Sequence, residues 1–336
     1  MRPTWTNEAR SSLENPIPPR VSRRARWLIA AVLLVASLSG TELFCRFRLG
    51  LGTPTLSIAD PEIEYLFAPN QHLRRFGNRV DYNAWSMRSD DFPVHKSQAN
   101  ELRVMVFGDS VINGGTLTDQ RDTATSTLQR QLGVVLGRPV VVGNISAGSW
   151  GPPNMLAYAQ RFGLFQADFV VLVLSSHDYA DAPTFEPVVG VSSDFPAQNP
   201  WCATWEAVTR YLPRYLPKRA AQPSAAEPAL QAANQKDIEA ALGALGGLIR
   251  LAKQSGAKVL VAQHLETEEL PPRRAKEGHA AIARVAHEMG IEAFDLEGQG
   301  DSSALYRDTI HPNQAGQAHM AARLLSAIQA DLDAVR

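Results

Sequence analysis

Five short apolar runs, separated by stretches with helical periodicity, constrain the fold of this chain more than any other feature of its sequence. The runs lie at 102–107, 139–145, 169–174, 257–262 and 291–296. Their lack of polar alternation is typical of strands buried on both faces of a parallel sheet. The helical stretches include 121–136, 152–165, 235–255, 272–289 and one that reaches about residue 334. We therefore predict an α/β fold, a three-layer α/β/α sandwich around a five-stranded parallel sheet, with right-handed crossovers.

An apolar segment near the N-terminus predicts one transmembrane helix over 25–44. From Trp27 to Phe44 no charge occurs before Glu42, and about 18 helical residues at 1.5 Å each approach the ~30 Å hydrocarbon thickness of a bilayer. Arginine is more frequent before the segment than after it: Arg20, Arg23, Arg24 and Arg26 precede it, and Arg46 and Arg48 follow. The positive-inside rule then predicts a single-pass signal anchor in a bacterial inner membrane, with the rest of the chain periplasmic or otherwise extracytoplasmic.

Two other interpretations of this segment remain open. Ser37 and Ser39 are small enough for a processing site, as in a cleaved signal peptide, and a buried core helix would be equally apolar. We favour the anchor because the segment is long for a signal-peptide core and polar, arginine-rich residues precede it.

The remaining regions are distinguished by composition. Residues 1–24 are rich in Pro, Arg, Ser and Asn without an apolar period, which predicts a disordered cytoplasmic tail. Residues 45–98 are broken by four prolines, and we expect strands or loops there, as a linker or accessory region beside a main domain at 99–336. The Ala-, Pro- and Gln-rich stretch 218–234 predicts a flexible surface loop, because the strand pattern resumes after it.

Charge and cysteine content exclude several classes of function. Lys and Arg number 33 against 34 Asp and Glu, so no global basic field favours nucleic acid as a partner. The two cysteines, Cys45 and Cys202, are too few for a disulfide framework or a cysteine zinc site. Neither a P-loop nor a glycine-rich dinucleotide motif follows the first apolar run, and no histidine pair has zinc-ligand spacing. We expect no cofactor and no metal.

A serine follows the first apolar run directly, in Gly108-Asp109-Ser110. Ligands of open α/β sheets bind beyond the carboxyl ends of the strands, so Ser110 lies where its hydroxyl can meet a substrate and nearby backbone N–H groups can face an anion. A simple turn and helix N-cap is the alternative interpretation of the same three residues.

A histidine with a carboxylate three residues before it precedes the last helical stretch, in Asp308-Thr309-Ile310-His311. Asp308 could accept the Nδ1–H of His311, which would leave Nε2 to take a proton from a serine. An isolated match of this kind is more often unrelated to catalysis, so its weight comes from the combination with Ser110 and from their order.

Polar residues also follow the second, third and fourth runs. The turn after the second run contains Gly148, where the backbone could present an N–H to a developing oxyanion or simply reverse direction. After the third run, His177 and Asp178 form a polar cluster, in which the histidine could donate to an oxyanion, cap a helix or be satisfied by neighbours. His264 follows the fourth run and could line the same site.

Taken together, these blocks resemble the SGNH, or GDSL-like, hydrolase family over roughly residues 99–336. The resemblance implies the flavodoxin-like SGNH hydrolase fold and a serine hydrolase mechanism. It assigns Ser110 as the nucleophile, His311 and Asp308 as its triad partners, and Ser110 and Gly148 as oxyanion donors, with Gly151 as an alternative to Gly148. Asp109 and Asp178 would lie nearby as supporting residues.

The third block departs from the family pattern, which has Gly-x-Asn-Asp where this chain has Ser175-Ser176-His177-Asp178. His177 therefore occupies the position of an asparagine that donates to the oxyanion. A ring N–H of His177 could still donate there, and one such donor is typically worth about 10²–10³ in rate.

We thus predict a serine esterase that acts on acyl esters, chiefly O-acetyl esters, of an exported substrate such as a cell-envelope or extracellular polysaccharide. A polysaccharide O-acetyltransferase with the same triad is one alternative. A non-catalytic polysaccharide-binding or assembly protein is another, motivated by His177. The expected partners are an acylated carbohydrate or other ester, the membrane through residues 25–44, and polysaccharide-assembly proteins, but not nucleic acid.

Overall fold

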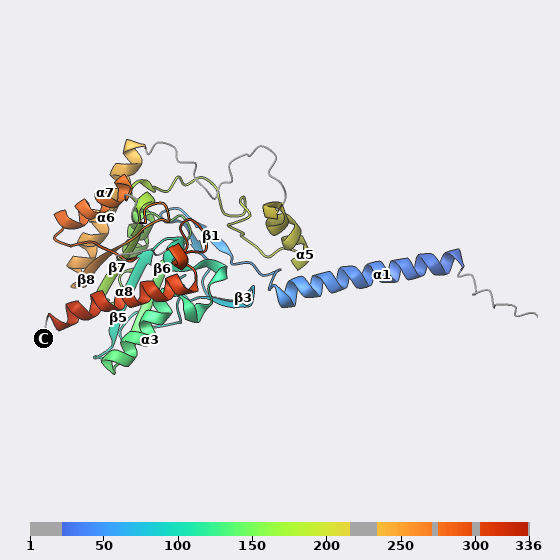
Figure 1. Cartoon of the computed structure of the whole chain (residues 1–336), viewed down its shortest axis with the longest axis horizontal. Coiled ribbons are helices and arrows are strands. Elements are labelled where there is room, and N and C mark those ends of the chain that lie inside the picture. The colour runs from blue at the N-terminus through green and yellow to red at the C-terminus, as the bar shows by residue number, and fades with distance from the viewer. Residues whose placement is uncertain (1–21, 216–233, 271–274, 298–302, 335–336) are drawn as a thin grey trace, which may run out of the picture.

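A long helix projects from a layered α/β domain (Figure 1). This computed structural model describes residues 22–215, 234–270, 275–297 and 303–334. The predicted tail at 1–24 and the predicted loop at 218–234 fall almost entirely outside the described residues. The central sheet of this domain positions the candidate functional site at one of its edges.

The central sheet has five parallel strands in the order β6-β5-β7-β8-β9, which confirms the predicted fold class. Its strands are β5 (Leu102–Gly108), β6 (Val140–Ser146), β7 (Phe169–Ser175), β8 (Lys258–His264) and β9 (Phe294–Asp295). β9 is shorter than the predicted strand at 291–296, because only Phe294 and Asp295 pair with β8 while Ile291 packs into the core beside a helix. Numbered in chain order the sheet reads 2-1-3-4-5, the doubly wound arrangement of flavodoxin-like folds.

Helices cover both faces of this sheet. One face carries α2 (Ser110–Asn113), α3 (Ala124–Leu136) and α8 (Gln314–Asp333), and the other carries α4 (Pro152–Phe162), α6 (Gln235–Gln254) and α7 (Glu277–Glu288). Alternate residues of β5 point into the two cores: Val104 and Val106 pack with the first group, Met105 and Phe107 with the second. The buried apolar strands thus organise two cores about one sheet.

Two helices begin later than their sequence patterns predict. α3 begins at Ala124 rather than 121, because the hydroxyl of Thr123 caps the helix by accepting the N–H of Ser126. α7 begins at Glu277 rather than 272, and residues 271–274 lie outside the described ranges. The helical periodicity of the sequence therefore predicted the positions of α3 and α7, but the first residue of α3 is set by the Thr123 cap.

The proline-broken region folds into two small antiparallel hairpins. β1 (Ser57–Asp60) pairs with β2 (Glu64–Phe67), and β3 (Gln71–Arg75) pairs with β4 (Asn78–Tyr82). Ile63, Tyr65 and Met87 are fully buried in the same core as Phe107. This region is consequently part of the core that contains Phe107, as well as a connection to the N-terminal helix.

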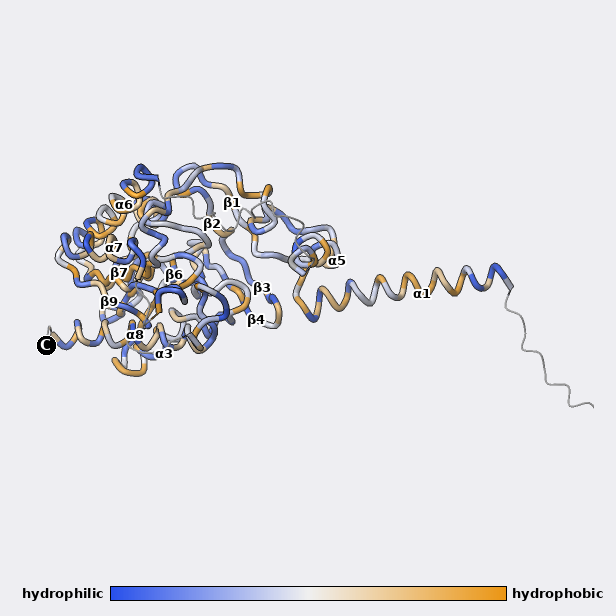
Figure 2. The backbone as a smooth tube through the Cα atoms, turned by 45° about the horizontal axis from the view of Figure 1, so that its top comes forward, coloured by the Kyte–Doolittle hydropathy of each residue, from blue (hydrophilic) through white to orange (hydrophobic). Residues whose placement is uncertain are grey.

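The N-terminal helix α1 spans Arg23–Leu43 and continues through a π-helical turn, η1 (Phe44–Arg48). Its apolar residues are exposed, and its most apolar 18-residue window has a mean hydropathy of 2.0 and is only 6% buried. Figure 2 shows this apolar helix standing clear of the domain. The interpretation as a buried core helix is therefore wrong, and by length and composition α1 can cross a membrane or serve as a signal sequence.

Candidate active site

The strand order of the central sheet has a switch point between β5 and β7. β5 is the first strand of the central sheet in chain order, and its neighbours β6 and β7 lie on opposite sides of it. At such a switch point the connecting segments leave in opposite directions, and ligands bind at the carboxyl ends of the strands. Ser110 begins α2 directly after β5, and the 3-10 turn η4 (Ser176–Ala180) directly follows β7.

Ser110, His311 and Asp308 form a continuous hydrogen-bonded chain. The Nε2 atom of His311 lies 3.0 Å from Ser110 Oγ, and its Nδ1 lies 3.0 and 2.9 Å from the two carboxylate oxygens of Asp308. Because an ionised carboxylate only accepts, Nδ1 carries the hydrogen and Nε2 accepts from the Ser110 hydroxyl. Burial alone would raise the pKa of Asp308, but the backbone N–H groups of His311 and Ile310 donate to it and lower that pKa.

The loop that carries Asp308 and His311 is held by the end of β8. His264 is buried, and its Nε2–H donates to the carbonyl of Ile310 at 2.7 Å. The hydroxyl of Tyr306 donates to the carbonyl of Leu265, and Tyr306 also bridges to Pro312 across the loop. His264 therefore touches the chain between the two predicted triad partners of Ser110.

A buried carboxylate fixes His264 in turn. Its Nδ1 lies 2.5 Å from Glu297, whose second oxygen accepts the N–H of Leu265 at 3.0 Å. Burial alone would lower the pKa of His264, but the hydrogen bond to Glu297 raises it. The histidine that the sequence predicts near the site thus holds the loop that carries Asp308 and His311.

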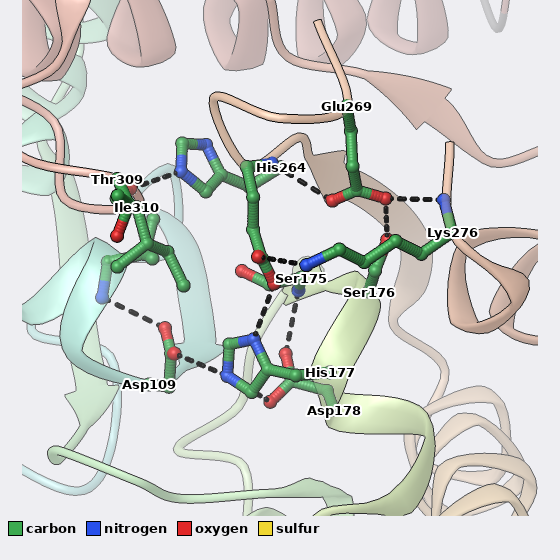
Figure 3. A network of polar contacts seen from close by, with 12 residues as sticks. Asp109, Ser175, Ser176, His177, Asp178, His264, Glu269, Lys276, Thr309 and Ile310 are labelled. Atoms are coloured by element: carbon green, nitrogen blue, oxygen red, sulfur yellow. Dashed lines mark hydrogen bonds and ion pairs between the residues drawn. The ribbon is translucent and has the colours of Figure 1, made fainter. Parts of the chain in front are cut away.

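His177 lies among three carboxylates at the end of β7 (Figure 3). Its Nε2 is 3.4 Å from Asp109 and 3.7 Å from Asp178, and its Nδ1 is 3.3 Å from Glu266. Both ring nitrogens consequently face carboxylates. An N–H of His177 could donate to an oxyanion only if the ring gave up its contact with one of these carboxylates. The predicted oxyanion role therefore requires the His177 ring to adopt another orientation.

Burial and the neighbouring charges shift the pKa values of the residues in this cluster. Burial alone would lower the pKa of His177, but Asp178, Asp109 and Glu266 raise it well above its ordinary value. His177 first, and Lys276 after it, hold the pKa of Glu266 at about 2 despite its partial burial. Burial would raise the pKa of Asp109, whereas its contact with His177 lowers it. The carboxylates that face both ring nitrogens therefore favour the protonated form of His177.

Asp109 connects this cluster to Ser110. Its side chain caps α2 by accepting the N–H of Val111 at 2.9 Å, and it is 1% exposed. The same carboxylate faces His177. Because Ser110 is the next residue along the chain, the position of the cap fixes the start of the helix that presents the Ser110 hydroxyl.

The two glycines of the second block have different surroundings. The carbonyl of Gly148 accepts the hydroxyl hydrogen of Tyr65, a residue of β2. Gly151 is the N-cap of α4, and its N–H donates to Asn154 Oδ1 at 3.1 Å. That bond engages the N–H that an oxyanion would need, so the structure favours Gly148 over Gly151 as the donor.

Comparison with known proteins places this site in a family. The model of the GDSL-like Lipase/Acylhydrolase family matches residues 106–319, well over half of the chain. The chain belongs to this family. It is an SGNH-type serine hydrolase, with Ser110 in the first block and His311 in the last, both within the matched residues.

Several solved structures are similar to this chain at low sequence identity. A structure of TesA is 19% identical with a TM-score of 0.43, over 68% of this chain and 98% of that one. The psychrotrophic esterase EstA from Pseudoalteromonas is 13% identical with a TM-score of 0.42, over 69% and 98%. An acetylxylan esterase from Geobacillus stearothermophilus is 13% identical with a TM-score of 0.42, over 68% and 94%. None of the curated proteins matches the chain.

Some residues of this GDSL-like site were not predicted from the sequence. Glu266 contacts His177, and Lys276 lies 2.5 Å from Glu266. Ser176 donates to Glu269 at 2.5 Å, beside the same cluster. Glu266 follows the end of β8 by two residues, so inspection of the residues after every strand would have found it. No sequence pattern indicates Lys276.

The cluster in this GDSL-like domain also has the spacing of a possible metal site. One ligand atom from each of Asp109, His177 and Asp178 lies within 4.8 Å of the others. A protonated imidazole between carboxylates accounts for the same contacts, and its separations of 3.4 and 3.7 Å are ion-pair distances. Metal binding by these three residues would require the imidazole to be neutral.

Proposed function

We propose that this GDSL-like hydrolase is a serine esterase in which Ser110 is the nucleophile and His311 and Asp308 complete its triad. The observation that carries the proposal is the chain of contacts from Ser110 Oγ through both ring nitrogens of His311 to Asp308, each step 3.0 Å or shorter. Serine hydroxyls are weak nucleophiles unless a neighbouring base takes the proton, and His311 is placed to do so.

In the proposed reaction, Ser110 Oγ attacks the ester carbonyl while its proton passes to Nε2 of His311. Asp308 stabilises the resulting imidazolium. The backbone N–H groups of Ser110 and Gly148 stabilise the oxyanion of the tetrahedral intermediate. His311 then returns the proton to the departing alkoxide, and water, activated by the same imidazole, releases the acid from Ser110.

We further propose that the substrate is an O-acyl, chiefly O-acetyl, ester of an exported polysaccharide. The triad lies near the surface, with the side chains of His311 and Asp308 29% and 47% exposed, which suits an ester group carried on a large polymer. The arginine excess before α1 supports a cytoplasmic N-terminus and an extracytoplasmic domain, with α1 as the anchor in a bacterial inner membrane.

Acetate release from p-nitrophenyl acetate and from an acetylated polysaccharide tests the proposal, using the purified full chain. Ser110→Ala should lower the rate by about 10³-fold or more, because the nucleophile is lost. Ser326→Ala, an exposed serine on α8, is the matched control and should retain full activity.

The results separate the alternatives. Activity that survives Ser110→Ala would contradict the assigned nucleophile. A folded wild type that consumes p-nitrophenyl acetate only with an added carbohydrate acceptor would indicate an acyltransferase. A folded wild type inactive under all conditions would favour a polysaccharide-binding protein.

A further inference from the structure

A helical segment beside α1 exposes an unusual row of large apolar side chains. α5 (Ala203–Glu206), a π-helical turn η5 (Ala207–Tyr211) and a 3-10 turn η6 (Leu212–Tyr215) follow one another without a break. Four large side chains recur on it at spacings of three and four residues, and Trp201 lies two residues before its start; all five are exposed. We call them the aromatic stripe, and their exposed fractions are Trp201 79%, Trp205 50%, Val208 47%, Leu212 47% and Tyr215 84%.

The opposite face of this segment is firmly packed on the domain. Ala203 is fully buried, and Glu206 is 4% exposed. Glu206 forms a buried ion pair with Arg75 of β3 and accepts the N–H of Gly52 at 2.6 Å. The hydroxyl of Tyr211 accepts from the same Arg75 at 3.0 Å. The stripe is thus the outer face of a fixed element.

The same segment is joined directly to the last turn of α1. The carboxylate of Glu42 accepts the N–H of Ala203 at 2.9 Å and both the N–H and the hydroxyl of Thr204, at 2.8 and 2.9 Å. Arg46 in turn donates to Glu42 at 2.9 Å. Figures 1 and 2 both place α5 beside the domain-proximal end of α1. The stripe is therefore held at the level at which α1 meets the domain.

We propose that the aromatic stripe rests in the interface of the membrane that α1 spans, so that the domain meets the bilayer at two points. This inference rests on the anchor role of α1 proposed above. The 21 residues of α1 cover about 32 Å, close to the hydrocarbon thickness, so its last turn reaches the headgroup level. Trp and Tyr are the side chains that favour this level, since they combine an apolar ring with a polar group.

Continuity with the anchor favours the lipid interface over a protein partner. Phe44 and Phe47, on the turn that continues α1, are 57% and 78% exposed, and they continue the exposed apolar surface of α1 past Leu43. A helix that lies in the interface with one apolar face buried gains affinity in proportion to that face. The second contact would limit tilting of the domain and hold its active site at a constant height above the membrane.

Quenching of tryptophan fluorescence by brominated phosphatidylcholine tests this inference on the full chain in vesicles. Trp201→Phe/Trp205→Phe should lower the bromolipid-quenched intensity about twofold, because interfacial tryptophans lie within reach of the brominated acyl chains. Trp85→Phe, a half-buried domain tryptophan, is the matched control and should leave the quenched intensity unchanged. Trp27→Phe, at the other end of α1, reports separately on insertion of the helix.

Each outcome bears on a different claim, and none depends on enzyme activity. Loss of quenched intensity in Trp201→Phe/Trp205→Phe supports the stripe as a membrane contact. Loss in Trp27→Phe alone would overturn the inference and leave the anchor intact. No loss in either variant would remove the anchor as well. Unquenched stripe residues in a chain that sediments as a dimer would assign the stripe to a second copy.

Discussion

Two histidines at the carboxyl edge of the sheet, His311 and His177, lie in contrasting surroundings. His311 has one carboxylate on one ring nitrogen and a hydroxyl on the other. His177 has carboxylates against both ring nitrogens. The first arrangement can take up and return a proton, whereas the second favours the protonated ring because carboxylates face both of its nitrogens. Proximity of histidine to carboxylate therefore does not by itself indicate a base.

The contrast divides the site into a reacting part and a supporting part. Asp308 is 47% exposed in its side chain and has only to orient and stabilise His311. Asp109 is 2% exposed, and an ionised carboxylate needs a cation nearby to remain in the interior, whereas burial raises the pKa of the fully buried Asp178 well above its ordinary value. His177 supplies that cation 3.4 Å from Asp109, the residue that precedes Ser110. His177, which stands where the family pattern has an asparagine, thus brings an ionisable ring into contact with buried carboxylates.

The largest effect is expected for Asp308→Asn, which tests the reacting part. An amide would leave His311 in the wrong tautomer for accepting the serine proton, and we expect kcat to fall about 10²–10⁴-fold. Steady-state ester hydrolysis measures this, with the exposed Asp90→Asn as control. If Asp308→Asn retained near wild-type kcat, His311 would not depend on its carboxylate, and the contrast with His177 would lose its basis.

The next effect is expected for His177→Ala, which tests the supporting part. Removal of the imidazolium leaves the buried carboxylate of Asp109 without a cation, and we expect a loss of about 2 kcal/mol in the free energy of unfolding. This value is below that of a fully buried pair because the ring is 36% exposed. Urea unfolding measures it. His287→Ala, which breaks an ion pair whose side chains are 74% and 86% exposed, should cost much less.

This loss should also depend on pH. The folded pKa of His177 lies above its unfolded value of about 6.5, so its contribution is fully present below that pH and disappears as pH rises through the folded pKa. The difference in unfolding free energy between wild type and His177→Ala should therefore shrink from pH 6 to pH 9. A difference that stays constant or grows would show that His177 is not stabilised as a cation.

The smallest effect is expected for Tyr306→Phe, which loosens the connection between the catalytic loop and its support. The hydroxyl that donates to the Leu265 carbonyl and lies 3.0 Å from Glu297 is lost, at a cost of about 1 kcal/mol. We expect kcat to fall about fivefold with KM unchanged, because the position of His311 and not the substrate pocket is disturbed. A change confined to KM would place Tyr306 against the substrate instead.

The sequence predicted the features that depend on local pattern. Unbroken apolar runs identified the strands, and the short motifs around Ser110 and His311 identified residues that the structure places 3.0 Å apart across 201 positions of the chain. The motifs and the sheet topology were enough to predict that Ser110 and His311 lie close together. Ser110 follows β5 and His311 follows β9, and the carboxyl ends of these parallel strands lie at one edge of the sheet.

Long-range contacts without a local pattern were not predictable. Glu266 is 89 residues from His177, and Glu42 is 161 residues from Ala203, and neither pair belongs to a motif. The burial of Tyr65 against the second-block turn was equally invisible, since the proline-broken region gave only short apolar pieces. Such contacts are selected by the tertiary fold and leave no period in the sequence.

Labelling with a fluorophosphonate, followed by mass spectrometry of the labelled peptide, tests the assigned nucleophile most directly. The wild-type chain should take up one label per molecule on Ser110, and His311→Ala should label far more slowly because the serine loses its base. His177→Ala, assayed where it remains folded, should still label on Ser110. A label on another residue, or none in the folded wild type, would contradict the account.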